Sequence, residues 1–135
     1  MRPIVVFTNG CFDGLHEGHI NLLREAKELG EYLVVGLNSD CSIRAIKGDD
    51  RPYFNESSRL TVLNAMKYVD RVIVFYDKTP ERLIKKIKPN FLVKGGDWIG
   101  KEIAGREYVE SIGGKVVFIP REVEISTTKI FKGGK

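Results

Sequence analysis

Short apolar runs alternate with amphipathic segments along this chain of 135 residues. The runs are rich in Val, Ile, Leu and Phe and lack polar alternation, as expected of strands that are covered on both faces. They predict five strands, at residues 4–7, 32–37, 72–75, 91–93 and 116–119. Strands that alternate with helices predict an α/β fold with a largely parallel sheet, formed by one domain over residues 1–135 with a frayed tail at 132–135.

The intervals between the strands carry helical patterns. Apolar residues recur at helical spacing from Ile20 to Leu29, and Gly30 is suited to end that helix. Further helices are predicted from Asn55 to Val69, from a Thr79 cap with Pro80 as first helical residue to about Lys88, over Glu102–Ile112, and from Ser126 or Thr127 onward. The stretch from 38 to 55 has no clear period. We expect a functional loop there, because it follows the carboxyl end of a strand.

Composition narrows the classes of function. The chain is 42% hydrophobic and 30% charged, which is typical of a protein with a packed core. No apolar run approaches the roughly 18 residues of a membrane span, and no secretory signal pattern is present. Cys11 and Cys41 are too few for a disulfide scaffold, so we expect a reduced, cytoplasmic protein without a membrane partner. The net charge of +4 comes from mixed charges without a nucleic-acid-binding pattern, which argues against nucleic acid as a partner.

The two histidines of the chain, His16 and His19, lie at the junction of the first strand and the first helix. At this spacing both rings lie on one side of the opening helical turn, where unpaired N–H groups and the helix dipole favour an anion. Gly18 lets a bulky group approach the backbone. An ordinary capping or surface role is the alternative, but the placement of both histidines favours an anion site. The spacing lacks the third ligand of a zinc site, and neither a dinucleotide fingerprint nor a Walker A loop is present.

These residues resemble a known family. Phe12-Asp13 followed by His16-Glu17-Gly18-His19 resembles the HxGH signature of the nucleotidyltransferase superfamily. Ser126-Thr127-Thr128 resembles its second signature, although such a run is also an ordinary helix cap. The resemblance covers Val5 to Ile130 and is strongest to the adenylyltransferase domains of ADP-heptose synthases. That branch is indicated by segments 8–13, 35–40, 47–52, 93–97 and 103–107.

Other features resemble the glycerol-3-phosphate cytidylyltransferases. Arg121 lies five residues before Ser126, and Gly96-Asp97-Trp98 also fits that branch. Glu124-Ile125 stands where the family generally has glycine. The alternatives are therefore ATP with heptose 1-phosphate, CTP with glycerol 3-phosphate or a similar phospho-alcohol, and a nucleotide-binding module without catalysis.

The resemblance implies a Rossmann-like fold and transfer of a nucleoside monophosphate to a phosphorylated sugar or polyol. It also implies Mg²⁺ held mainly by the nucleotide, and a homodimer. The residues implied in catalysis are His16, His19 and Lys47. Those implied in nucleotide binding are Cys11, Phe12, His16, His19, Gly95, Asp97, Arg121, Ser126, Thr127 and Thr128. Those implied in acceptor binding are Asp13, Lys47 and Arg59. Solvated charge is the alternative for Lys47, and a helix-face ion pair is the alternative for Arg59. The resemblance also implies that segment 94–98 lines the nucleotide pocket, where its glycines admit the base or ribose and Asp97 or Trp98 contacts it. A plain glycine turn is the alternative for this segment.

Overall fold

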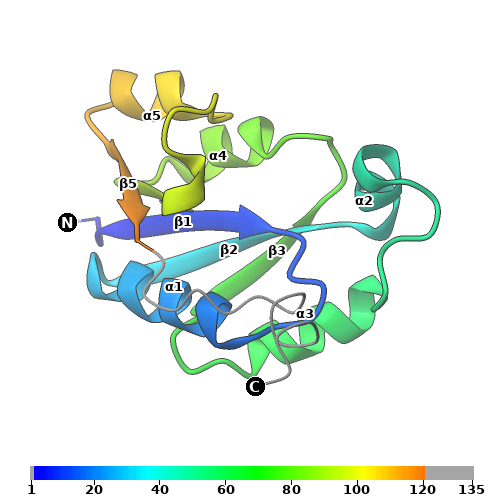
Figure 1. Ribbon diagram of the computed structural model, residues 1–135. Coiled ribbons are helices and arrows are strands. Elements are labelled where there is room, and N and C mark those ends of the chain that lie inside the picture. Colours follow the sequence, from blue (N-terminus) through cyan, green and yellow to red (C-terminus); the bar gives the residue numbers. More distant parts are fainter. Residues whose placement is uncertain (1, 121–135) are drawn as a thin grey trace.

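Five parallel strands form one sheet in the computed structural model, which describes residues 2–120 (Figure 1). Their order across the sheet is β3-β2-β1-β4-β5. The strands are β1 (Val5–Gly10), β2 (Tyr32–Asn38), β3 (Arg71–Phe75), β4 (Phe91–Gly95) and β5 (Lys115–Ile119). Each contains or closely overlaps a predicted apolar run, and the predicted α/β fold class is confirmed.

Helices cover both faces of the sheet (Figure 1). They are α1 (Glu17–Glu28), α2 (Asp40–Lys47), α3 (Glu56–Asn64), α4 (Glu81–Ile87) and α5 (Arg106–Ser111), with a 3₁₀ turn η1 (Gly96–Trp98) after β4. Successive strand residues point to opposite faces, so Val6 packs in the core under α1 and α3 and Phe7 packs in the core under α4 and α5. Because both faces are apolar, polar chemistry is left to the ends of the strands.

Helix α2 lies in the segment that the sequence predicted as a loop. Ser39 caps it, with its Oγ accepting a hydrogen bond from the Ser42 backbone N–H at 3.1 Å. Ile43 is fully buried, but α2 has only eight residues. A helix of two turns gives too few apolar repeats for the period to be recognised.

Two other helices begin later than predicted. The N-cap of α4 is Pro80, without a side-chain capping bond, so the predicted Thr79 cap was wrong. Helix α5 begins after Gly105, whose φ of 86° is left-handed. A Cβ at Gly105 would lie 2.6 Å from the Cδ1 atom of Ile84, so close packing against α4 also requires glycine there. The predicted helix over 102–112 therefore forms only in its second half.

The last predicted helix, from Ser126 or Thr127, and the tail at 132–135 lie outside the described residues. Within residues 2–120, no helix is long and apolar enough to cross a membrane.

Strands β1 and β4 separate at their carboxyl ends. Their ladder pairs Val6 with Phe91 and Phe7 with Leu92 and goes no further, although both strands continue. The chain adds β2 and β3 on one side of β1 and then β4 and β5 on the other. Open α/β sheets bind ligands in the crevice at such a switch point. The topology therefore places the candidate site beyond β1 and β4.

Candidate active site

A cavity of about 240 Å³ lies at the carboxyl ends of β1 and β4. It brings together the predicted nucleotide-binding residues that lie in the described part of the chain, namely Cys11, Phe12, His16, His19, Gly95 and Asp97. Trp98, from the segment implied to line the nucleotide pocket, is also in its wall, together with Lys94 and Asn9, to which the sequence gave no individual role.

A second, larger cavity of about 830 Å³ adjoins the first. Both histidines, Lys94 and Trp98 line the two cavities together. Two cavities that meet along one shared wall can hold two substrates with their reacting groups in contact. The shared wall is therefore where we place the chemistry.

The side chains of the two histidines cap the first turn of α1. The His16 Nδ1 accepts a hydrogen bond from the Gly18 backbone N–H at 3.0 Å, and the His19 Nδ1 accepts one from the His16 backbone N–H at 3.2 Å. The ring centroids lie 4.2 Å apart. A neutral imidazole that accepts through Nδ1 carries its proton on Nε2. Both histidines therefore cap the helix. The capping bonds also orient the rings, so that the Nε2–H of each lies on the edge opposite the cap.

Gly18 fits between the histidines because it has no side chain. A Cβ at this position would lie 2.8 Å from Cε1 and 3.1 Å from Nδ1 of the His16 ring. Any other residue would displace the ring or distort the helix start. Gly18 therefore controls the orientation of the His16 imidazole.

Lys94 is the buried cation of the site. Lys94 is only 8% exposed, and its Nζ lies 4.2 Å from the centroid of the Trp98 ring. A long hydrogen bond of 3.4 Å joins Nζ to the Asn9 Oδ1 across the gap between β4 and β1. Burial lowers the pKa of Lys94 to about 8, although the nearby Asp97 and Cys11 partly oppose the shift. The sequence offered a signal, because Lys94 is the first polar residue after the apolar run of a central strand.

Asp13 holds the loop that follows α2. Its carboxylate accepts hydrogen bonds from the backbone N–H groups of Tyr53 at 2.7 Å and Phe54 at 2.8 Å, and it pairs with Arg51 at 3.4 Å. Burial alone would raise the pKa of Asp13, but these three contacts outweigh it and hold the pKa below its usual 3.8. Asp13 lines the larger cavity, yet its oxygens are engaged by the protein. Its visible function is to fix one wall of that cavity.

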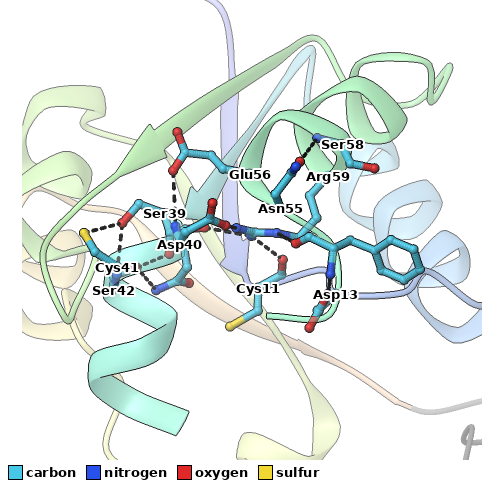
Figure 2. Close-up of polar contacts among 12 residues, drawn as sticks. Cys11, Asp13, Ser39, Asp40, Cys41, Ser42, Asn55, Glu56, Ser58 and Arg59 are labelled. Carbon is cyan, nitrogen blue, oxygen red and sulfur yellow. Dashed lines mark hydrogen bonds and ion pairs between the residues drawn. The ribbon is translucent and has the colours of Figure 1, made fainter. Parts of the chain in front are cut away.

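Arg59 requires a correction to the acceptor-binding prediction. It is only 2% exposed and lines neither of these cavities. Its guanidinium donates to the backbone oxygens of Phe54, Cys11 and Asn38 and forms an ion pair with Asp40 at 2.7 Å (Figure 2). With four of its five N–H donors engaged by the protein, Arg59 holds the strand ends together, which argues against a phosphate clamp. The ion-pair alternative describes it better.

Lys47 lies on the larger cavity, as the acceptor-binding prediction requires. It is the last residue of α2 and is exposed to solvent. Two further cations, Arg51 and Lys78, line the same cavity. Lys78 comes after the carboxyl end of β3, so the rule that ligands bind at that edge of the sheet could have identified it. The same cavity is lined by the carboxylates of Asp13, Glu81 and Glu102, and Arg51 is paired with Asp13.

The remaining predicted site residues, Arg121, Ser126, Thr127 and Thr128, lie outside the described residues. Between residues 2 and 120, no group of three His, Cys, Asp or Glu side chains could hold a metal ion.

Known proteins show clear similarity to this chain. The model of the cytidylyltransferase-like family matches residues 7–133. A bifunctional protein HldE of Pelobacter propionicus is 47% identical over 128 residues, which cover 95% of this chain and 26% of that protein. A lipopolysaccharide core biosynthesis protein of Thermoplasma volcanium is 31% identical, with a TM-score of 0.73, and the match covers 92% of this chain and 100% of that one. A pantothenate synthetase of Thermus thermophilus, at 17% identity and a TM-score of 0.64, shares the fold over 94% of this chain and 61% of its own.

The chain thus spans about a quarter of the length of the curated relatives it matches. The family model nevertheless spans every residue that lines the two cavities. The matches agree with the resemblance inferred from the HxGH residues.

Proposed function

This chain belongs to the cytidylyltransferase-like family, and from that premise we propose that it transfers AMP from ATP to heptose 1-phosphate, giving ADP-heptose and pyrophosphate. The observation that carries the proposal is the shared wall of the two cavities, where His16 and His19 are held by their own capping bonds. A nucleotide in the smaller cavity and a phosphorylated acceptor in the larger one would meet at these imidazoles. A sugar-phosphate acceptor is also supported by the relative that carries the name of a lipopolysaccharide core biosynthesis protein.

The reaction needs alignment and charge neutralisation more than it needs a base. An oxygen of the acceptor phosphate attacks the α-phosphorus, a new P–O bond forms, and the bond to the β-phosphate oxygen breaks as pyrophosphate leaves. The attacking oxygen is already anionic, so no side chain has to remove a proton or form a covalent intermediate. Donors fixed before the reaction stabilise the charge that develops on the phosphoryl group.

Residues of both cavities contribute to the proposed reaction. The Nε2–H groups of His16 and His19 donate to the phosphates of the nucleotide, and their Nδ1 atoms remain on the helix cap. Lys47, which lines the larger cavity together with Arg51 and Lys78, binds the acceptor phosphate. From the family resemblance, we propose that Arg121 and the hydroxyls of Ser126, Thr127 and Thr128 bind the phosphates of the nucleotide.

Mg²⁺ enters this proposal as a partner of the nucleotide. The described residues hold no cluster of three metal-binding side chains, so no step is assigned to a protein-bound metal. The triphosphate oxygens are the hard ligands that Mg²⁺ prefers. A homodimer is likewise proposed from the resemblance alone.

The test measures pyrophosphate release with each combination of ATP or CTP and heptose 1-phosphate or glycerol 3-phosphate. We expect the highest kcat/KM with ATP and heptose 1-phosphate. A tenfold advantage for CTP with the same acceptor, about 1.4 kcal/mol, would overturn the adenylyltransferase assignment and leave nucleotidyl transfer intact. Nucleotide binding without pyrophosphate release in any combination would point to a noncatalytic binding module.

A further inference from the structure

Lys94 occupies an unusual position for a lysine. It ends the apolar part of β4, a central strand, and lines both cavities where they meet. Only 8% of the residue is exposed, so its ammonium has lost most of its hydration. Asp97, by contrast, lines only the smaller cavity and Lys47 only the larger one. Among the cations of the described chain that line these cavities, Lys94 alone lies on their shared wall.

The protein leaves the charge of Lys94 incompletely satisfied. No carboxylate of residues 2–120 forms an ion pair with its Nζ within 4.0 Å. The hydrogen bond to Asn9 is long, at 3.4 Å, and the Trp98 ring supplies only the weaker attraction of an aromatic face. Asp97 is near but outside ion-pair distance, so the burial of the ammonium is only partly compensated, and an anion that enters the cavity lowers its cost.

We propose that Lys94 is a catalytic residue, whose ammonium contacts the transferred α-phosphoryl group and neutralises the charge that develops there. The inference rests on the proposed function, because it places the α-phosphoryl group where the nucleotide and acceptor cavities meet. Lys94 faces this junction from β4, and the histidines face it from α1. The phosphoryl group is thus held between donors on two elements.

Proton binding gives this contact a measurable signature. Desolvation lowers the pKa of Lys94 to about 8, so close to half of the molecules carry a neutral amine at that pH. A polyanion beside Nζ favours the charged form, so nucleotide binding at pH 8 takes up a proton in those molecules. The uptake expected at a pH equal to the pKa is about half a proton per nucleotide.

Other charged groups face the same space and have to be separated from Lys94. They are Cys11, Asp13, His16, His19, Lys47, Arg51, Lys78, Glu81, Asp97 and Glu102. Every variant keeps these groups, so their contributions to proton uptake cancel when the variants are compared with the wild type. Lys101 offers a matched control, since its Nζ lies 5.7 Å from the Trp98 ring and it lines neither of these cavities.

The first experiment measures proton uptake without any acceptor present. ATP is titrated into the wild-type protein, and into the variants Lys94→Met, Lys94→Arg and Lys101→Met, in two pH 8 buffers that differ in ionisation enthalpy. We expect about half a proton taken up by the wild type and by Lys101→Met, and close to none by either Lys94 variant. Equal uptake in all four proteins would overturn the contact between Lys94 and the nucleotide.

The second experiment measures the rate and its dependence on pH. Lys94→Met should lower kcat about 10²–10³-fold, the usual loss for one donor that acts on developing charge. In the wild type, kcat/KM should fall as the pH rises above about 8, because the ammonium is lost. Lys94→Arg keeps its charge over this range and should remove that fall, even if the larger side chain lowers the rate. A purely structural role for Lys94 would leave the shape of the pH profile unchanged.

The outcomes separate this inference from the proposed function. ATP binding with Lys94-dependent proton uptake, but without turnover of any acceptor, would contradict the proposed reaction and support the phosphate contact. Turnover that persists at the wild-type rate in a folded Lys94→Met variant would contradict the role of Lys94 and leave the reaction standing. If Lys94→Met shows no melting transition, it does not fold, and the pH profile of Lys94→Arg then tests the role of Lys94. Failure of the wild type to bind ATP or CTP would overturn both.

Discussion

His16 and His19 each use two ring nitrogens for two purposes. The Nδ1 atoms satisfy backbone N–H groups at the start of α1, and the Nε2–H groups lie at the opposite edges of the rings. Alanine removes both nitrogens together, so an alanine variant loses stability and chemistry at once. Asparagine at position 16 keeps the capping acceptor but has no counterpart of the Nε2–H donor, because its side-chain oxygen is a strong acceptor at an N-cap.

We therefore expect His16→Ala and His16→Asn to differ in stability and agree in rate. His16→Ala should lose about 0.5–2 kcal/mol of unfolding free energy, the usual value of an N-cap, and His16→Asn should retain most of it. Both should lower kcat about 10²–10³-fold, because both lack the Nε2–H donor. At the third helical position, where His19 accepts from the N-cap N–H, glutamine is the matching acceptor, so His19→Gln should behave in the same way. Urea denaturation and steady-state kinetics measure the two effects.

Wild-type turnover in folded His16→Asn would show that the imidazole serves only the helix cap. Equal losses of stability in the alanine and asparagine variants would instead contradict the assignment of Nδ1 to capping.

Gly18→Ala tests the spacing between the histidines. In an ordinary helix this change stabilises by about 0.5–1 kcal/mol, because alanine loses less backbone freedom on folding than glycine. Here the new Cβ would lie 2.8 Å from the His16 ring, so we expect no gain in stability and at least a tenfold loss of kcat. The measurement is kcat at saturating substrates together with the melting temperature. A stabilised variant with normal kcat would show that the ring moves aside at no cost.

At the scale of elements, Arg59 of α3 joins segments that are distant in the sequence. It bonds to the residue after β1, to the end of β2, to the start of α2 and to the loop before α3 (Figure 2). These segments form the edge on which both cavities open. Removing the guanidinium would leave the Asn38 carbonyl buried without this donor, and it would break a largely buried ion pair.

We expect Arg59→Met to lower the unfolding free energy by about 1–3 kcal/mol, the usual cost of leaving a buried acceptor without its donor. Arg82→Met is the matched control, because Arg82 forms a similar ion pair with Asp77 on the surface. That variant should keep the urea midpoint of the wild type. Equal midpoints for the two variants would mean that the Arg59 contacts are no stronger than a surface pair.

The sequence predicted the elements where the physical signal was strong. Apolar runs such as Val72–Phe75 identified all five strands, because strands buried on both faces leave no polar alternation. The signal was weak for α2, which is short and buries Ile43 as its single large apolar residue. It was misleading around Gly105, where a helical pattern continues through a residue whose backbone is left-handed.

The candidate site was predicted in part for a related reason. His16 and His19 are close in the sequence, so their spacing alone placed them on one helical turn. The role of Arg59 could not be derived in this way, because its partners lie up to 48 residues away and are mostly backbone oxygens. Segment 94–98 was placed at the nucleotide pocket, but Lys94 received no role of its own, because the burial of a lysine depends on how the neighbouring strands and Trp98 pack around it.

At the scale of the whole molecule, different sets of strands carry the two cavities. The ends of β1 and β4 carry the smaller cavity, and the ends of β2 and β3 with their following segments add the larger one. The two substrates therefore have separate contacts on either side of a shared wall. Changes away from that wall should affect one substrate at a time.

Lys47→Met and Asp97→Asn test this division as a pair. Lys47 lines only the larger cavity, so Lys47→Met should raise KM for the phosphorylated acceptor about 10–100-fold, the value of one charge-assisted hydrogen bond, and leave the Kd for ATP unchanged. Asp97 lines only the smaller cavity, so Asp97→Asn should change the Kd for ATP and leave the acceptor KM unchanged. Calorimetry without acceptor gives the Kd, and initial rates at saturating ATP give the KM. If either variant altered both constants equally, the two cavities would have to be treated as one binding site.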